Sequence, residues 1–240
     1  MKKLVGIFKQ VIKTIQLSIF LSRCKLCGSL LVLEGEELIC SECKAEIMPV
    51  DAPVCKLCGR IVENRHRMCG ECIVKPPRFK KHLSYAIYDG VLKDLILLFK
   101  YGEIKKLKKL LARYYIEIIE KRINERFDFI IPVPADKSRK RDFSPVYEIA
   151  KILSRRLSIP LLRGNLTKIR TTEPQAGLSR YKRLKNLNGA FKVKDPTRVK
   201  GKKILLIDDV YTTGTTIKKC SELLAKAKAD VTALTLSRSM

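Results

Sequence analysis

The sequence lacks any run of about 18 uncharged apolar residues, the length that a transmembrane helix requires. Residues 4–21 come nearest, but Lys9 and Lys13 interrupt them, and no small-residue cleavage site of a secretory signal follows. Their apolar side chains recur at helical spacing, so we expect an amphipathic helix over residues 1–22 that packs on a partner domain or approaches the inner face of a membrane. The sequence therefore predicts a cytoplasmic protein with no transmembrane segment.

Acidic residues are scarce in comparison with basic ones. The 240 residues include 24 Asp and Glu against 50 Lys and Arg, which gives a formal net charge of +26. A thermophilic composition does not account for this excess, because it raises glutamate together with lysine. The charge predicts a polyanionic partner, such as nucleic acid, a phosphate-rich metabolite or an anionic membrane face.

Histidine, a common general base, occurs only twice. His66 stands between Arg65 and Arg67, which favours an exposed loop over a metal ligand, and His82 has no catalytic groups near it in the sequence. The N-terminal Met1-Lys2 offers no cysteine nucleophile, so glutamine-fed amination has no support in the sequence. The sequence thus identifies no general base for transfer to a nucleobase.

Cysteine is abundant and regularly spaced. Two Cys-x-x-Cys pairs can complete a tetrahedral site of four thiolates, so four pairs predict two structural zinc ions; sequential and interleaved pairing are both possible. Disulfides would require an oxidising compartment, which nothing in the sequence indicates. The ninth cysteine, Cys220, falls on a predicted helix and is interpreted as a small core residue. The predicted zinc ligands are Cys24, Cys27, Cys40, Cys43, Cys55, Cys58, Cys69 and Cys72.

The chain divides at a linker that contains Pro76-Pro77, which predicts a zinc-finger module over residues 23–75 and a second domain over residues 82–240. In the second domain apolar runs alternate with amphipathic stretches, as in an α/β fold with a mostly parallel sheet. The predicted strands are residues 83–87, 129–133, 204–207 and 231–236. The predicted helices are residues 91–99, 104–122, 146–157 and 215–227.

Residues 204–216 join a buried strand, two carboxylates and a loop of hydroxyls and glycine that begins a helix. Backbone amides at a helix N-terminus form an anion cradle, and Gly214 lets the backbone turn close to a phosphate. Two adjacent carboxylates can accept hydrogen bonds from vicinal ribose hydroxyls, a role that an ordinary capped helix would leave unexplained. The predicted ribose-phosphate site comprises Asp208, Asp209, Thr212, Thr213, Gly214, Thr215 and Thr216, and the two aspartates are also the catalytic candidates.

The order of motifs along nearly the whole chain resembles the ComF family. The resemblance is carried by the cysteine pairs, Lys100-Tyr101-Gly102, Pro132-Val133-Pro134, residues 172–178, Gly189-Ala190-Phe191 and the ribose-phosphate run. It implies a zinc finger, a type I phosphoribosyltransferase fold that binds 5-phosphoribosyl-1-pyrophosphate (PRPP) with magnesium, and the handling of single-stranded DNA in natural transformation. A competence helicase or another DNA-uptake protein is a further implied partner.

Basic clusters with interleaved aromatic residues are compatible with single-stranded DNA, because charge follows the backbone while exposed rings stack on bases. One cluster spans residues 105–109, and a solvated helix face is the alternative interpretation of any single cluster. The aromatic candidates are Tyr114, Tyr115, Phe143 and Tyr181. The predicted DNA-binding residues are Lys137, Arg139, Lys140, Arg141, Arg180, Lys182 and Arg183.

One segment departs from the family pattern. Where the family usually continues Arg-Gly-Phe-Asn-Gln, this chain has Arg141-Asp142-Phe143-Ser144-Pro145, without a flexible glycine and two amide side chains near the expected pyrophosphate. The departure favours ligand binding over turnover. An active phosphoribosyltransferase that uses an amine or a nucleobase as acceptor remains the alternative.

Overall fold

The computed structural model describes residues 22–31, 38–63, 68–102, 104–135, 144–172 and 186–240. The helix predicted over residues 1–22 therefore lies outside the described part, except for Ser22. Within the described ranges, no helix combines the length and the hydropathy that a bilayer span requires. The domain limits drawn from the sequence stay predictions.

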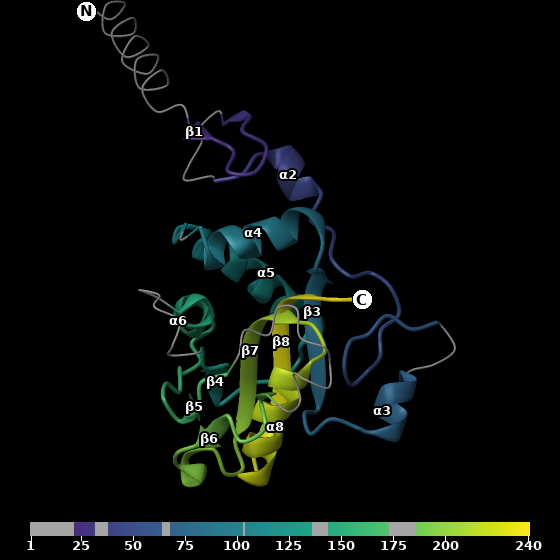
Figure 1. The fold of residues 1–240 in the computed structure, drawn as a ribbon, viewed down its shortest axis with the longest axis vertical. Coiled ribbons are helices and arrows are strands. Elements are labelled where there is room, and N and C mark those ends of the chain that lie inside the picture. Colours follow the sequence, from purple (N-terminus) through teal and green to yellow (C-terminus); the bar gives the residue numbers. More distant parts are fainter. Residues whose placement is uncertain (1–21, 32–37, 64–67, 103, 136–143, 173–185) are drawn as a thin grey trace, which may run out of the picture.

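A four-stranded parallel sheet forms the centre of the molecule (Figure 1). Its inner strands are buried on both faces, which suits their continuous apolar runs. The strands, in the order in which they lie, are β3 (Lys81–Ile87), β8 (Asp230–Arg238), β7 (Lys203–Tyr211) and β4 (Phe129–Pro132). This arrangement confirms the α/β fold and the four strands predicted from the sequence.

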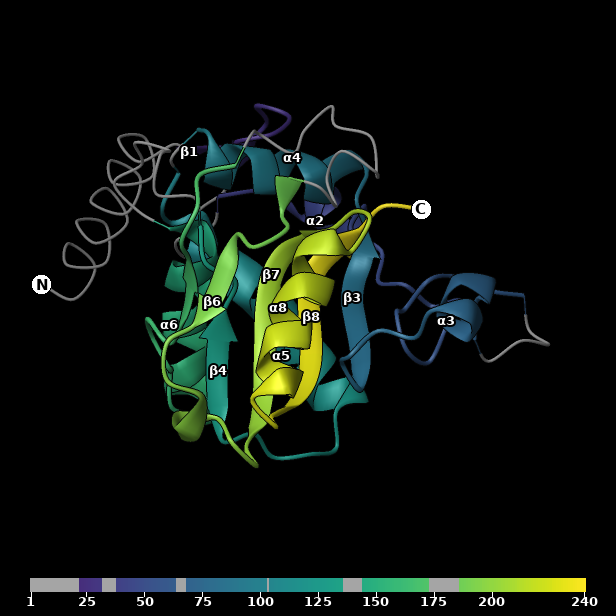
Figure 2. The same cartoon turned by 60° about the horizontal axis from the view of Figure 1, so that its bottom comes forward.

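Helices cover both faces of the sheet (Figure 2). Helix α8 (Thr215–Lys226) packs on one face, against β7 and β8, while α5 (Leu107–Arg122) and α6 (Pro145–Leu157) pack on the other. Helix α4 (Gly90–Lys100) packs on α5. Successive residues of β7 point to opposite faces, so Leu206 joins the core beneath α8 and Leu205 joins the core beneath α5.

A small antiparallel pair of strands, β5 (Leu166–Lys168) and β6 (Phe191–Val193), was not predicted. Each strand has three residues, too few to show a period of two. Strand β6 contacts α8 and contains Phe191 of the Gly-Ala-Phe motif. The 3-10 helix η1 (Pro196–Arg198) follows it.

The cysteine-rich region consists of short elements beside the α/β domain. Strands β1 (Ser22–Arg23) and β2 (Leu30–Leu31) pair, and they are followed by the five-residue helices α2 (Ser41–Ala45) and α3 (Gly70–Val74). So little regular structure cannot bury a core of its own, which agrees with a region that metal ligation holds together.

Candidate ribose-phosphate site and metal centres

The cysteines form two groups of four, each made from sequential pairs. The first cysteine cluster contains Cys24, Cys27, Cys40 and Cys43, and the second cysteine cluster contains Cys55, Cys58, Cys69 and Cys72. Within each cluster, all sulfur atoms lie within 4.8 Å of one another. The structure thereby decides between the two pairings that the sequence left open, in favour of the sequential one.

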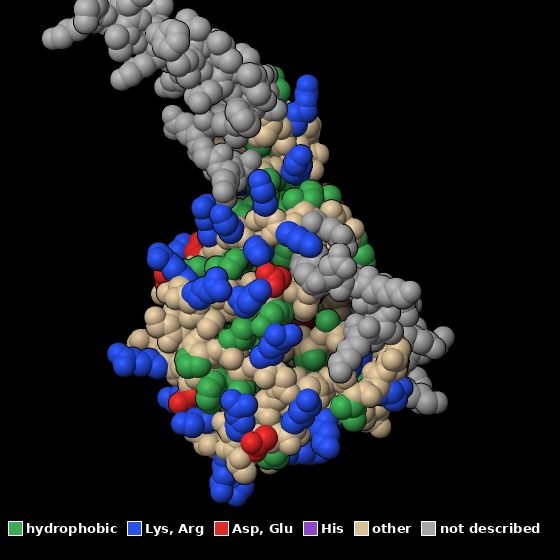
Figure 3. All heavy atoms as spheres, turned by 90° about the vertical axis from the view of Figure 1, so that its left-hand side faces the viewer, with side chains coloured by type: hydrophobic (Ala, Val, Ile, Leu, Met, Phe, Trp, Pro, Cys, Tyr) green, Lys and Arg blue, Asp and Glu red, His purple; other side chains and the backbone are tan. Residues whose placement is uncertain are grey.

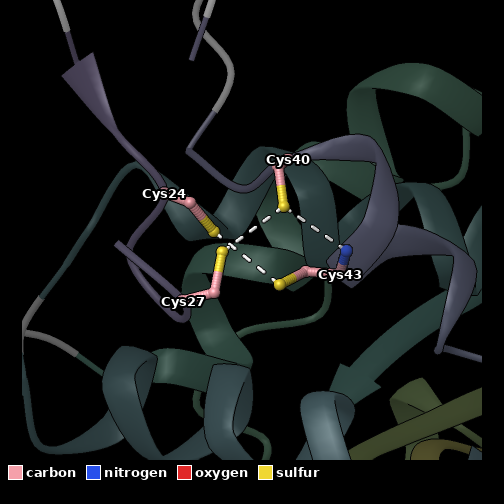
Figure 4. A group of neighbouring side chains, drawn as sticks. All are labelled: Cys24, Cys27, Cys40 and Cys43. Atoms are coloured by element: carbon pink, nitrogen blue, oxygen red, sulfur yellow. Dashed lines mark hydrogen bonds between the residues drawn. The ribbon is translucent and has the colours of Figure 1, made fainter. Parts of the chain in front are cut away.

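The sulfur geometry of the first cluster suits zinc (Figure 4). Four thiolates at about 2.3 Å from a tetrahedral zinc ion are separated by about 3.8 Å. The Sγ–Sγ distances are 3.8 Å from Cys24 to Cys43 and 3.6 Å from Cys27 to Cys40. The side chains converge on one centre from a turn and from the N-terminus of α2, where the backbone N–H of Cys43 donates to Cys40 Sγ at 3.4 Å.

The second cluster repeats this arrangement, with 3.6 Å between Cys58 Sγ and Cys69 Sγ. Burial alone would raise the pKa of the Cys55 thiol, but hydrogen bonds from the backbone of Cys58, Cys69 and Leu57 lower it to about 7. Backbone amides directed at sulfur stabilise the thiolate form that a metal requires. Two sites of four cysteines each therefore fit two structural zinc ions, as predicted.

The loop predicted to bind phosphate, residues 212–216 (the phosphate loop below), connects the end of β7 to α8 at the carboxyl edge of the sheet. Parallel α/β sheets place ligands at this edge. Thr212 is exposed, whereas Thr215 is buried and its hydroxyl lies 2.7 Å from that of Thr213. The loop brings the predicted threonines together at the N-terminus of a 12-residue helix, where backbone N–H groups favour an anion.

Gly214 is required at the turn of this loop. Its φ is +70°, a left-handed conformation, and a Cβ built there would lie 2.1 Å from the ring of Tyr211. The Tyr211 ring is buried, so it has no open space into which to move. The sequence predicted the need for glycine from the approach of a phosphate; the structure adds the ring packed against it.

The strand predicted over residues 204–207 continues to Tyr211, so Asp208 and Asp209 lie within β7 just after its fully buried residues. As neighbours in a strand, they point to opposite faces. The carboxylate of Asp208 accepts a hydrogen bond from the backbone N–H of Asp209 at 2.9 Å, and the Asp208 carbonyl accepts one from the hydroxyl of Tyr115. Burial, followed by the charge of Asp209, raises the pKa of Asp208 to about 8, although Lys100 opposes this shift. The carboxylate of Asp208 can therefore be stabilised by a proton, a metal ion or a ligand hydroxyl.

Lys100 lies at the candidate site, although the sequence assigned it no role. It ends α4, and its Nζ lies 2.7 Å from Oδ1 of Asp209. Burial lowers the pKa of Lys100, but the charges of Asp209 and Asp208 outweigh it and raise the pKa overall. A protonated lysine thus stands at the carboxylates. The only sequence signal was its place in the Lys-Tyr-Gly motif.

The structure corrects the interpretation of two tyrosines as base-stacking rings. Tyr114 and Tyr115 are 9% and 0% exposed, because both point from α5 into the core. Tyr114 packs on Tyr85 at a ring-centroid distance of 4.6 Å. Neither ring is available to a DNA base.

The basic cluster at the start of α5 does reach solvent. Lys105, Lys106 and Lys109 are exposed. Lys108, which is half-buried, forms an ion pair with Glu148 at 2.8 Å. Lysine and arginine side chains predominate over acidic ones on the face of the molecule shown in Figure 3. The other predicted residues lie outside the described ranges: Lys137, Arg139, Lys140, Arg141, Arg180, Lys182, Arg183, Phe143, Tyr181 and His66.

Comparison with known proteins finds two domain families along the chain. The double zinc ribbon domain matches residues 17–73, and the phosphoribosyl transferase domain matches residues 100–238. DNA utilization protein YhgH of Shigella flexneri is 32% identical over 85% of this chain and 90% of its own length. Competence protein ComFC of Bacillus subtilis is 28% identical over 90% of this chain and 95% of its own length.

Among solved structures, adenine phosphoribosyltransferase from Thermoanaerobacter pseudethanolicus is 16% identical, with a TM-score of 0.38 over 57% of this chain and 71% of that one.

Proposed function

Because this chain belongs to the ComF family, which joins a double zinc ribbon to a phosphoribosyltransferase domain, we propose that it binds PRPP and handles single-stranded DNA during natural transformation. The observation that carries the proposal is that two adjacent carboxylates in the last four residues of β7 precede a loop of hydroxyls and glycine at the N-terminus of α8. An ordinary strand-to-helix connection does not explain two adjacent carboxylates at this position, one of which has a raised pKa.

The phosphate loop provides the anion site for the 5′-phosphate, through backbone N–H groups and the hydroxyls of Thr212, Thr213 and Thr216. Asp208 and Asp209 accept hydrogen bonds from the two ribose hydroxyls. Lys100, within 2.7 Å of Asp209, holds that carboxylate in place and supplies a positive charge at the ribose. Magnesium, when bound with the ligand, neutralises the pyrophosphate.

The DNA role is supported by the charge of the chain and by its relatives. The net charge is +26, and exposed lysines cluster at the start of α5. The relatives carry the names DNA utilization protein and competence protein. Phosphate contacts from lysine and arginine supply most of the affinity of such proteins for nucleic acid.

Titration calorimetry with PRPP and Mg²⁺ tests the ribose-phosphate site. We expect the wild-type chain to bind PRPP and Asp209→Asn to weaken binding by about tenfold or more. The substitution removes the negative charge that pairs with Lys100 and that accepts a hydrogen bond from the ligand. Asp230→Asn is the matched control, since Asp230 is exposed and begins β8, at the edge of the sheet opposite to the candidate site. Equal affinities of all three proteins would refute the site.

Fluorescence anisotropy of a labelled single-stranded oligonucleotide tests the DNA role. We expect binding at low salt, and any change on addition of PRPP would show that the two ligands are coupled. No binding at low salt would refute this part of the proposal, and the charge would then need another explanation.

Phosphoribosyl transfer is the second candidate function, favoured by the match of residues 100–238 to the transferase domain. It predicts release of pyrophosphate from PRPP in the presence of an amine or nucleobase acceptor, and loss of this release in Asp208→Ala. We expect little turnover, because Ser144 and Pro145 stand where the family has amide side chains. Sustained pyrophosphate release would reverse this preference.

A further inference from the structure

The second cysteine cluster is seated directly on the sheet, at the edge formed by β3. The carbonyl of its ligand Cys58 accepts hydrogen bonds from His82 Nδ1 at 3.0 Å and from Arg238 Nη1 at 2.7 Å. The backbone N–H of His82 donates to the carbonyl of Leu57 at 2.7 Å. A Cβ on Gly59 would lie 2.8 Å from the His82 carbonyl oxygen. The backbone of the cluster therefore cannot shift without moving β3.

His82 has a single orientation in this contact. Since the Cys58 carbonyl can only accept, Nδ1 carries the proton, while Nε2 lies within hydrogen-bonding distance, 3.0 Å, of the Thr235 hydroxyl. Partners on both sides fix the plane of the ring.

The His82 ring connects the cysteine cluster to Tyr211. The two rings stack with centroids 4.0 Å apart and planes 27° apart, and the guanidinium of Arg238 lies 5.4 Å from the Tyr211 ring centroid. All three side chains are buried. The groups that hold the Cys58 carbonyl are thus the same groups that hold the Tyr211 ring.

Tyr211 in turn supports the phosphate loop. Its ring packs so closely on Gly214 that no side chain fits between them. A second connection joins the same two parts, because Lys218 of α8 forms an ion pair with Glu71 of α3, between the ligands Cys69 and Cys72. Both contacts run from the second cysteine cluster to the loop or to the helix that follows it.

We propose that zinc at the second cysteine cluster positions the phosphate loop, and that His82, Tyr211 and Arg238 are positioning residues for ribose-phosphate binding. The inference rests on the proposed ribose-phosphate site and names the groups that hold its loop in place. By thermodynamic reciprocity, a ligand on the loop tightens the retention of zinc at the second cluster by the same factor by which zinc tightens the ligand.

The first cysteine cluster provides the internal control. Its buried cysteines pack in the core that contains α4 and α5, whereas those of the second cluster pack with Tyr211 and α8. Cys43 and Cys72 occupy equivalent places, each within a five-residue helix. Serine substitutions at these two positions thus remove equivalent ligands from different cores.

Hydrogen exchange of the full chain, with no ligand present, measures the support of the loop. We expect Cys72→Ser to accelerate exchange in residues 212–218 by about tenfold, and Cys43→Ser to leave these residues unchanged. Equal protection of residues 212–218 in both variants and the wild type would overturn the proposal. This measurement does not depend on PRPP, so it stands apart from a failure of the proposed function, which would show as no PRPP binding by the wild type.

Substitutions at Tyr211 keep the test valid if Cys72→Ser does not fold. We expect Tyr211→Leu to weaken the binding of PRPP and of ribose 5-phosphate by about tenfold, because the loop loses its support. Tyr211→Phe, which keeps the stacked ring, should restore affinity. Tyr114→Leu, which removes another buried tyrosine, should leave affinity unchanged.

Zinc release to a chelator gives the reciprocal measurement. In Cys43→Ser, where zinc remains at the second cluster, PRPP should slow zinc release, and Tyr211→Leu added to this background should abolish the slowing. Ligand affinity that falls equally in Tyr211→Leu and Tyr114→Leu, or zinc release that PRPP does not slow in a chain that binds PRPP, would overturn the proposal.

Discussion

Asp208 and Asp209 are neighbours in one strand, yet their surroundings differ. Asp209 has a lysine counterion at 2.7 Å, whereas the carboxylate of Asp208 is stabilised by one backbone N–H and destabilised by burial and by its neighbour. A buried carboxylate whose desolvation outweighs the opposing charge of Lys100 lowers stability. The Asp208 carboxylate therefore lowers the free energy of unfolding of the ligand-free chain, and the proposed ligand offsets this loss when it binds.

This cost predicts a pH-dependent effect of Asp208→Asn. Because the folded-state pKa of Asp208 is raised to about 8, the folded chain holds a proton that the unfolded chain loses near pH 4, so stability falls as pH rises between these values. Asp208→Asn removes the ionisable group. The free energy of unfolding of the variant minus that of the wild type should therefore be larger at pH 8.5 than at pH 6.5, by up to about 2 kcal/mol. Urea unfolding of the zinc-loaded proteins measures this difference. A difference that does not change with pH would contradict the shifted pKa.

Gly214 gives a second prediction for a single residue. Gly214→Ala must adopt a φ of +70° and place a Cβ 2.1 Å from the buried Tyr211 ring, so we expect a loss of about 2–4 kcal/mol in the free energy of unfolding and weaker PRPP binding. Gly201→Ala has the same φ of +70° with nothing within 4 Å of its Cβ, and should lose only about 1–2 kcal/mol. Equal losses in denaturant unfolding would show that the ring contact carries no cost.

Among the elements, the short helices α2 and α3 depend on zinc. Each has five residues, far fewer than the roughly 12 that an isolated helix needs to be stable in water. Their regular structure must therefore come from ligation by Cys40 and Cys43 in one case and Cys69 and Cys72 in the other. Helices α5 and α8, in contrast, are held by apolar faces buried on the sheet.

This dependence predicts the zinc content of the chain. The wild type should contain two zinc ions per chain, and Cys43→Ser and Cys72→Ser about one each, because three remaining thiolates at one cluster bind zinc more weakly while the other cluster is intact. Elemental analysis of the purified proteins, with protein concentration measured independently, decides this. One zinc ion in the wild type, or none in either variant, would contradict two independent sites.

For the whole molecule, the excess of positive charge should govern association with DNA. Each phosphate contacted by a basic residue releases counterions, so affinity falls linearly with salt on logarithmic axes. Replacing Lys105, Lys106 and Lys109 by Gln should reduce the slope of this line by about 2 to 3. The measurement is fluorescence anisotropy with a single-stranded oligonucleotide across a salt series.

The matched control for this prediction is replacement of Lys192, Lys194 and Lys200, which are also exposed but lie on and after β6. This control removes the same amount of charge from another surface. If DNA follows the start of α5, the control should change the slope less than replacement of Lys105, Lys106 and Lys109 does. The same change in both triple variants would show that the charge acts as a general field rather than at one surface.

The sequence by itself determined the features that depend on near neighbours in the chain. Cysteine spacing predicted eight zinc ligands, and the alternation of apolar runs predicted the four strands of the sheet, because a ligand pair and a periodic segment are complete within a few residues. The order of strand, carboxylates, glycine and helix likewise predicted the loop at residues 212–216, whose ligand remains a proposal.

The tertiary structure alone decided which distant groups meet. Crossovers between parallel strands bring Lys100 to Asp209, bury Tyr114 and Tyr115, and carry Arg238 to the carbonyl of Cys58 across 180 residues of sequence. No local period encodes such contacts, because they depend on strand order and on the face of the sheet toward which each side chain points. The local sequence thus determines the zinc ligands and the loop, and the packing of the sheet determines which residues contact them.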